Sequence, residues 1–184
     1  MNIPNLLTLL RILLTPLLII FLIDRKYDLA FVVFCVAGIS DGLDGFIARI
    51  MKQKTRIGAI LDPIADKALL SSSYITMAVI GVIPDWLAVA VISRDLIIVL
   101  GVLVLLLFHS GIEICPSLIS KLTTLFQLIT IFAVLGSKVL DLSVQPVITS
   151  LYIITLILTV TSGLHYIYRG VGMIGSENNG QQSA

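Results

Sequence analysis

Four aspartates in two pairs stand out in a chain that is otherwise rich in apolar residues. Asp41 and Asp44 are three residues apart, and Asp62 and Asp66 are four apart. Side chains at these spacings lie on the same face of a helix. Because an unpaired carboxylate in an apolar environment costs several kcal/mol, the two pairs indicate that something strongly positive binds between them. A pair of divalent metal ions meets that need.

The aspartates and the residues around them indicate which metal ions and ligands the site could bind. Carboxylate oxygens without histidine or cysteine favour Mg²⁺ or Mn²⁺ over zinc. Small residues leave room beside the carboxylates for a planar base or a phosphate, namely Gly45, Ala48 and Gly58. Arg49 lies about one turn after Asp44 and could neutralise a phosphate. The alternative is a salt-bridge network with basic neighbours such as Lys52 and Lys67, but such a network does not need small residues at fixed offsets.

The composition shows which elements must hold these residues. The 184 residues are 58% hydrophobic and 12% charged, whereas charged residues make up about 25% of an ordinary soluble domain. Six apolar stretches approach or exceed the roughly 18 to 20 residues that cross a bilayer, at about 6–23, 29–50, 60–82, 86–108, 118–140 and 147–168. The sequence therefore predicts an all-α integral membrane protein with six transmembrane helices.

The distribution of charge predicts the orientation of these helices. Basic residues crowd the second connection, namely Arg49, Lys52, Lys54 and Arg56. The positive-inside rule then places both termini in the cytoplasm. Arg11 and Lys121 agree with this orientation, and Lys138 disagrees. The two acidic pairs consequently lie near the cytoplasmic ends of the second and third helices. With 12 basic and 11 acidic residues, the chain has no basic excess that would indicate nucleic-acid binding.

The sequence predicts one membrane domain over residues 1–175. Residues 176–184 are polar and rich in Gln and Asn, so we expect a disordered tail there. Cys35 falls on a predicted membrane helix and Cys115 in a cytoplasmic-side loop, so a structural disulfide is not expected. The first apolar stretch is long enough to remain as a membrane helix rather than serve as a cleaved signal peptide.

The whole pattern, D-x2-D-G-x2-A-R-x8-G-x3-D-x3-D between Asp41 and Asp66, resembles the signature of the CDP-alcohol phosphatidyltransferases at every key position. The opening NIPNLLTLLRI and the run LDPIADK also resemble the branch that makes glycerol phospholipids from CDP-diacylglycerol. The resemblance implies a membrane enzyme, commonly a homodimer, that transfers a phosphatidyl group to an alcohol and releases CMP. It implies a bacterial inner (cytoplasmic) membrane protein whose active site faces the cytoplasm.

The resemblance also implies roles for individual residues. Asp41, Asp44 and Asp62 would be ligands of two Mg²⁺ or Mn²⁺ ions, and Asp66 would be both a ligand and the general base. The cytidine diphosphate site would be lined by Gly45, Ala48, Arg49, Thr55 and Gly58, with Asn5 nearby.

A second cluster must hold the acceptor. Arg94 lies about 12 Å inside the fourth predicted helix at the helical rise per residue, and a charge at that depth is a functional hypothesis by default. The alternative is a local structural partnership with Asp95. Lys121, at the start of the fifth helix, could add a second positive charge or could be an ordinary interfacial lysine. An anionic acceptor such as glycerol 3-phosphate or phosphatidylglycerol would suit such a pair.

The choice between these two acceptors stays open. The segments ISRDLIIVLG and SLISKLTTLFQ resemble both phosphatidylglycerophosphate synthases and the cardiolipin synthases of the same family. Asp95, Val102 and Ser120 depart from the usual pattern of the former, whereas the former is the commoner enzyme among short bacterial chains. We give glycerol 3-phosphate first and phosphatidylglycerol as the alternative. A membrane transporter is a remote alternative, because intramembrane carboxylates also mark ion paths, and a non-catalytic scaffold is another.

Overall fold

The computed structural model describes the backbone of residues 3–51, 56–108, 118–141 and 144–181, and the side chains of residues 8–40, 64–101, 118–141 and 144–168. Helices account for nearly all of these ranges, and no strand occurs in them. The helices are α1 (Ile3–Ile23), α2 (Tyr27–Met51), α3 (Arg56–Val79), α4 (Asp85–Phe108), α5 (Leu118–Val139) and α6 (Gln145–Gln181). The all-helical fold predicted from the six apolar stretches is confirmed.

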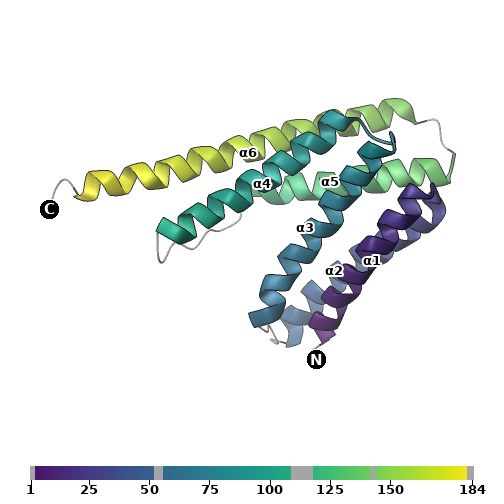
Figure 1. Cartoon of the computed structure of the whole chain (residues 1–184), viewed down its shortest axis with the longest axis horizontal. Helices are drawn as coiled ribbons and strands as arrows, with labels where there is room; N and C mark the ends of the chain where they lie inside the picture. The colour runs from purple at the N-terminus through teal and green to yellow at the C-terminus, as the bar shows by residue number, and fades with distance from the viewer. Residues whose placement is uncertain (1–2, 52–55, 109–117, 142–143, 182–184) are drawn as a thin grey trace.

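The helices form two groups that meet at an angle (Figure 1). In one group α1 packs against both α2 and α3, and in the other α6 packs against both α4 and α5. Contacts of α3 with α4 and of α2 with α5 join the groups. The end of α2 and the start of α3 lie at the same end of the molecule as the N-terminus (Figure 1). The acidic halves of α2 and α3 are therefore at one end of the fold.

Among the described side chains, the hydrophobic core lies around the opposite ends of the helices. It draws on every helix, with members that include Leu18, Phe34, Leu70, Leu87, Leu135 and Ile148. In α1, α3 and α5 these residues belong to the second half of the helix, and in α2, α4 and α6 to the first half. Those halves meet around the short α1–α2, α3–α4 and α5–α6 connections. The core thus fixes the ends of the helices that are remote from the aspartates.

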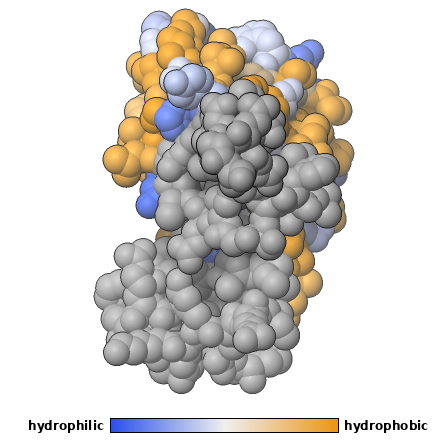
Figure 2. All heavy atoms as spheres, turned by 90° about the vertical axis from the view of Figure 1, so that its left-hand side faces the viewer, coloured by the Kyte–Doolittle hydropathy of each residue, from blue (hydrophilic) through white to orange (hydrophobic). Residues whose placement is uncertain are grey.

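The outer faces of the helices are strongly apolar. Large hydrophobic side chains are exposed on each helix, among them Leu13, Val32, Val79, Val89, Phe132 and Ile157. On the face shown in Figure 2, many of the coloured residues around the edge of the view are hydrophobic, with a few polar residues between them. Apolar surface on this scale indicates a membrane or protein interface. Two of the described helices, at Leu118–Val139 and Gln145–Tyr168, are long and apolar enough to cross a membrane.

The last helix is longer than the sequence predicts. The apolar stretch ends near Tyr168, but α6 continues to Gln181 and runs past the rest of the bundle (Figure 1). Its backbone is thus helical at 176–181, where the sequence predicts a disordered polar tail. Once a helix is formed, each further residue adds a hydrogen bond without a new nucleation cost, so a polar segment can continue it. The division of the chain at residue 175 stays a prediction.

Candidate active site

The backbone places the two acidic pairs on two helices whose adjacent ends are joined by residues 52–55. Asp41 and Asp44 lie in the second half of α2, and Asp62 and Asp66 lie in the first half of α3. Because α3 begins at Arg56, the Asp62–Pro63 pair lies inside the helix and does not start it.

The side chain of Asp66 is described, but those of the other predicted metal and nucleotide residues lie outside the described residues. These are Asn5, Asp41, Asp44, Gly45, Ala48, Arg49, Gly58 and Asp62, and the backbone of Thr55 is also outside.

Asp66 is held by a residue from the N-terminal helix. Arg11 of α1 donates a hydrogen bond from Nη1 to Asp66 Oδ1, and the two side chains form an ion pair. The arginine side chain is 0% exposed and the aspartate side chain 41% exposed. From the sequence, Arg11 was interpreted only as support for the cytoplasmic location of the N-terminus. A basic residue inside an apolar stretch was the signal that could have marked it as a partner of the acidic site.

The chemistry of Asp66 fits a divalent metal ion. An ionised carboxylate has about four lone-pair positions on its two oxygens, so one hydrogen bond from Arg11 does not exhaust it. Its partial exposure keeps it accessible. Where side chains are described, no three acidic, histidine or cysteine side chains form a cluster, and the three other predicted ligands lie beyond those ranges. Asp66 is thus suited to metal or proton binding at the acidic end of the fold.

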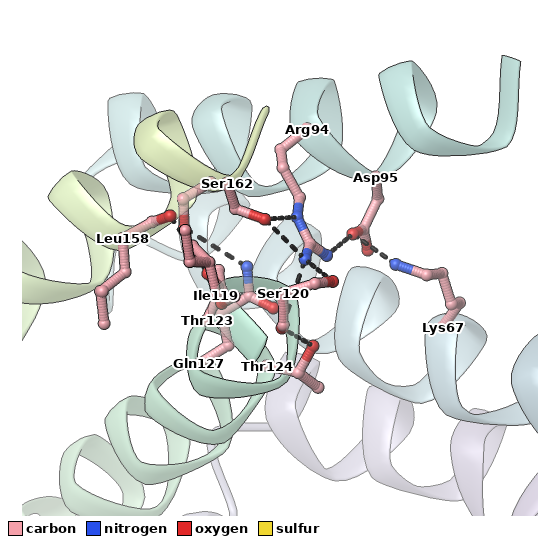
Figure 3. Close-up of polar contacts among 11 residues, drawn as sticks. Lys67, Arg94, Asp95, Ile119, Ser120, Thr123, Thr124, Gln127, Leu158 and Ser162 are labelled. Atoms are coloured by element: carbon pink, nitrogen blue, oxygen red, sulfur yellow. Dashed lines mark hydrogen bonds and ion pairs between the residues drawn. The ribbon is translucent and has the colours of Figure 1, made fainter. Parts of the chain in front are cut away.

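A second polar site joins the two helix groups (Figure 3). Its centre is Asp95 of α4, whose Oδ1 accepts hydrogen bonds from Arg94 Nη1 at 2.7 Å and from Lys67 Nζ. Lys67 belongs to α3 and follows Asp66 directly. The side chain of Asp95 is 9% exposed and that of Arg94 is 3% exposed, whereas that of Lys67 is 38% exposed. The lysine is the accessible cation of this site.

Two serines hold the other side of the guanidinium. Nη2 of Arg94 donates to Ser120 Oγ at 2.5 Å and to Ser162 Oγ at 3.1 Å, and Nε reaches Ser162 Oγ at 3.3 Å. Ser120 belongs to α5 and Ser162 to α6. At Gly163 an added Cβ would lie 3.7 Å from Arg94 Cγ, so α6 passes close to the arginine stem. We call Lys67, Arg94, Asp95, Ser120 and Ser162 the four-helix cluster.

The predicted acceptor residues differ in their surroundings. Arg94 is buried and bonded to Asp95, as in the structural partnership that the sequence raised as an alternative. Lys121 is exposed near the start of α5, beside Ser120. The sequence did not indicate Lys67 as a functional residue, because a lysine next to an acidic pair also fits a simple salt-bridge network.

A row of polar contacts between α5 and α6 supports the four-helix cluster. Thr123 Oγ1 donates to the Leu158 carbonyl at 3.1 Å, and Thr130 and Thr155 share a hydrogen bond of 2.8 Å. Between them, Gln127 Nε2 donates to Thr159 Oγ1 at 3.4 Å. These contacts set the register of the two helices, and so place Ser120 and Ser162 at the same level.

Comparison with known proteins agrees with the acidic pattern. The family model for CDP-alcohol phosphatidyltransferase matches residues 1–162. The chain is 34% identical to the CDP-diacylglycerol–glycerol-3-phosphate 3-phosphatidyltransferase of Aquifex aeolicus, over 96% of this chain and 100% of that protein. It is 34% identical to a probable phosphatidylglycerophosphate synthase of Mycobacterium tuberculosis, over 95% and 84%. It is also 33% identical to the cardiolipin synthase (CMP-forming) of Rattus norvegicus over 92% of this chain, which spans 61% of the rat protein. The chain belongs to the CDP-alcohol phosphatidyltransferase family.

Proposed function

We propose that this protein transfers a phosphatidyl group from CDP-diacylglycerol to a glycerol-type acceptor and releases CMP. The observation that carries the proposal is Asp66, a partly exposed carboxylate held by the buried Arg11 on one of the two helices that carry the acidic pattern. Membership of the family supports the reaction type.

In this proposal Asp66 acts as general base. The acceptor hydroxyl gives its proton to the Asp66 carboxylate while its oxygen attacks the phosphorus that carries the diacylglycerol. The bond from that phosphorus to CMP breaks, and CMP leaves with the bridging oxygen. Arg11 keeps one carboxylate oxygen in place, so the other can face the hydroxyl. The arrangement needs Asp66 to stay ionised until the acceptor binds.

Asp66 and the other three aspartates of the acidic pattern would hold the metal ions. Asp41, Asp44, Asp62 and Asp66 are the proposed ligands of two Mg²⁺ or Mn²⁺ ions, which when bound would neutralise charge on the pyrophosphate of the donor. The proposed nucleotide residues are Asn5, Gly45, Ala48, Arg49, Thr55 and Gly58. The proposal rests on their spacing in the sequence and on the placement of most of them on α2 and α3.

The site lies at the edge of a membrane in this proposal. All six helices would cross the bilayer, with both termini and the active site on the cytoplasmic side of a bacterial inner membrane. Support comes from the two long apolar helices, the exposed apolar side chains on each helix, and the basic residues around the α2–α3 connection. A homodimer, and a membrane domain over residues 1–175, complete the proposal.

Two acceptors are supported. Glycerol 3-phosphate is favoured by the similarity to the Aquifex aeolicus phosphatidyltransferase, which this chain covers in full. Phosphatidylglycerol is the alternative, supported by the similarity to the rat cardiolipin synthase. Both molecules carry a phosphate three carbons from a primary hydroxyl. The predicted acceptor contacts, Arg94 and Lys121, follow from this shared chemistry.

A transfer assay tests the proposal. Purified protein in lipid nanodiscs is supplied with CDP-diacylglycerol, Mg²⁺ or Mn²⁺, and in turn glycerol 3-phosphate, phosphatidylglycerol, inositol or serine. We expect CMP release with one glycerol-type acceptor, loss of release with EDTA, and a lipid product whose mass identifies the acceptor. Asp66→Asn serves as the inactive control. Absence of CMP with every acceptor, together with solute flux in sealed vesicles, would favour the transporter.

A further inference from the structure

The four-helix cluster contains more positive than negative charge. Lys67 and Arg94 both bond to one carboxylate oxygen of Asp95, so the three side chains together carry one net positive charge. Ser120 and Ser162 contribute neutral hydroxyl groups. A net charge in an apolar bundle is costly unless a counter-ion offsets it. The cluster is therefore suited to an anion.

Lys67 is the cation that such an anion can reach. Arg94 is 3% exposed, and its Nε, Nη1 and Nη2 groups already donate to Ser162, Asp95 and Ser120. An anion could bind Arg94 only by breaking these bonds. Lys67 is 38% exposed, and its ammonium group has three N–H donors, one of which is directed at Asp95. Two donors can turn toward a ligand while the ion pair with Asp95 persists.

The position of Lys67 links this anion to the reaction. It follows Asp66 in α3, and consecutive residues of a helix point about 100° apart. Asp66 reaches Arg11 on α1, whereas Lys67 reaches Asp95 on α4. A molecule lying against this turn of α3 can meet both side chains, with its phosphate at Lys67 and its hydroxyl at Asp66. Glycerol 3-phosphate and phosphatidylglycerol share that layout.

We infer that Lys67 binds the phosphate of the acceptor, and that Arg94 is a positioning residue that acts on Lys67 through Asp95. The inference rests on the proposed function and deepens it, because it makes a phosphate on the acceptor a requirement for tight binding. It moves the acceptor contact from the buried Arg94 to the accessible lysine beside the base.

Steady-state kinetics of Lys67→Met test the inference. We expect the KM for the acceptor to rise about tenfold or more, the scale of a lost hydrogen bond to a charged group, while the KM for CDP-diacylglycerol changes less than about twofold. Lys67→Arg is expected to retain part of the affinity, because it keeps the charge with a different shape. Inorganic phosphate serves as a second probe. It should compete with the acceptor, and its inhibition constant should rise in Lys67→Met by a similar factor.

Lys26→Met is the matched control. Lys26 is also exposed and also pairs with an aspartate, Asp24, at 3.2 Å, but it lies in the turn between α1 and α2. We expect its kinetics to equal those of the wild type. If Lys67→Met fails to fold, as judged by circular dichroism, Lys67→Gln is measured instead, since the amide can still donate to Asp95.

Combined variants separate binding from positioning. Arg94→Ala should raise the acceptor KM in the wild-type background but add little in the Lys67→Met background, because both changes remove one interaction. Equal effects of Arg94→Ala in the two backgrounds would overturn the inference and place the phosphate on Arg94 itself. An unchanged acceptor KM in an active Lys67→Met protein would also overturn it. If the wild type releases no CMP with any acceptor, the proposed function fails instead.

Discussion

Replacing Arg11 by methionine removes the guanidinium that holds Asp66. Methionine has a long unbranched side chain that can fill much of the buried space left by the arginine. If Asp66 is the general base, as proposed, kcat should fall, because a carboxylate that has lost its partner spends less time in the orientation that accepts the hydroxyl proton. The donor and acceptor still bind, so both KM values should change little.

The exposure of the two partners sets the size of the effect. An exposed ion pair contributes about 0 to 1 kcal/mol, whereas breaking a buried one costs about 3 to 5 kcal/mol. Here the arginine side chain is 0% exposed and the aspartate side chain 41% exposed, so the solvated carboxylate reduces the cost to about 1 to 2 kcal/mol. Since about 1.4 kcal/mol corresponds to a factor of ten in rate, we expect kcat to fall roughly 5-fold to 30-fold.

The assay measures CMP release at saturating donor and acceptor over a range of Mn²⁺ concentrations. The positive charge of Arg11 would oppose a metal ion held by Asp66, so its removal should leave the Mn²⁺ concentration for half-maximal activity unchanged or lower. Arg11→Lys should restore part of kcat because the charge returns without the fork geometry. Arg25→Met, which removes an exposed arginine just after α1, is the matched control.

Two results would refute the reasoning on Arg11. A kcat within about twofold of the wild type would show that Asp66 does not need this partner, since that factor is below the smallest change expected from the ion pair. A clear rise in the Mn²⁺ requirement would show that the arginine maintains the structure of the site and does not orient its base.

Two further predictions concern the separate roles of the aspartates and the hydrogen bonds in the interior of the bundle. Asp66→Asn should abolish turnover while Mn²⁺ binding, followed by electron paramagnetic resonance, is largely kept, whereas Asp41→Asn should weaken Mn²⁺ binding itself; equal binding defects in both would contradict the separate role of Asp66. Thr130→Val should lower the melting temperature by removing one partner of the buried Thr130–Thr155 hydrogen bond, at a cost of about 1 to 3 kcal/mol. Adding Thr155→Val should restore part of that loss, and a strictly additive second loss would contradict the pairing.

The helices could be predicted from sequence because each apolar stretch is bounded by charged residues, proline or glycine. The expected limits at 86–108 and 118–140 differ by a single residue from α4 and α5. An apolar segment of bilayer length can adopt few structures other than a helix, because in lipid every backbone polar group must be hydrogen-bonded within the segment. The end of α6 was missed because a polar segment that continues a helix carries no periodic apolar signal.

The candidate site was predictable only where its residues are close in sequence. The acidic pairs are visible because spacings of three and four share a helix face. Arg11 and Asp66 are 55 residues apart, and Arg94 and Ser162 are 68 apart. Such pairs depend on which helices pack together, and one sequence does not show that. The pairing of Arg94 with Asp95 was predicted as an alternative, but the hydrogen bond from Lys67 to the same carboxylate was not.

In the proposed membrane topology, the polar row between α5 and α6 bears on how these two helices enter the bilayer during synthesis. Thr123 and Thr130 can also donate to carbonyls of their own helix, but the side-chain amide of Gln127 donates to Thr159 on α6. If α5 faced lipid by itself, that amide would be desolvated without this partner, at a cost of a few kcal/mol. We therefore expect α5 to wait beside the translocon until α6 emerges, and the two to enter lipid together as a hairpin. Crosslinking of α5 to the translocon in ribosome-stalled chains of increasing length would reveal that delay, and Gln127→Leu should shorten it.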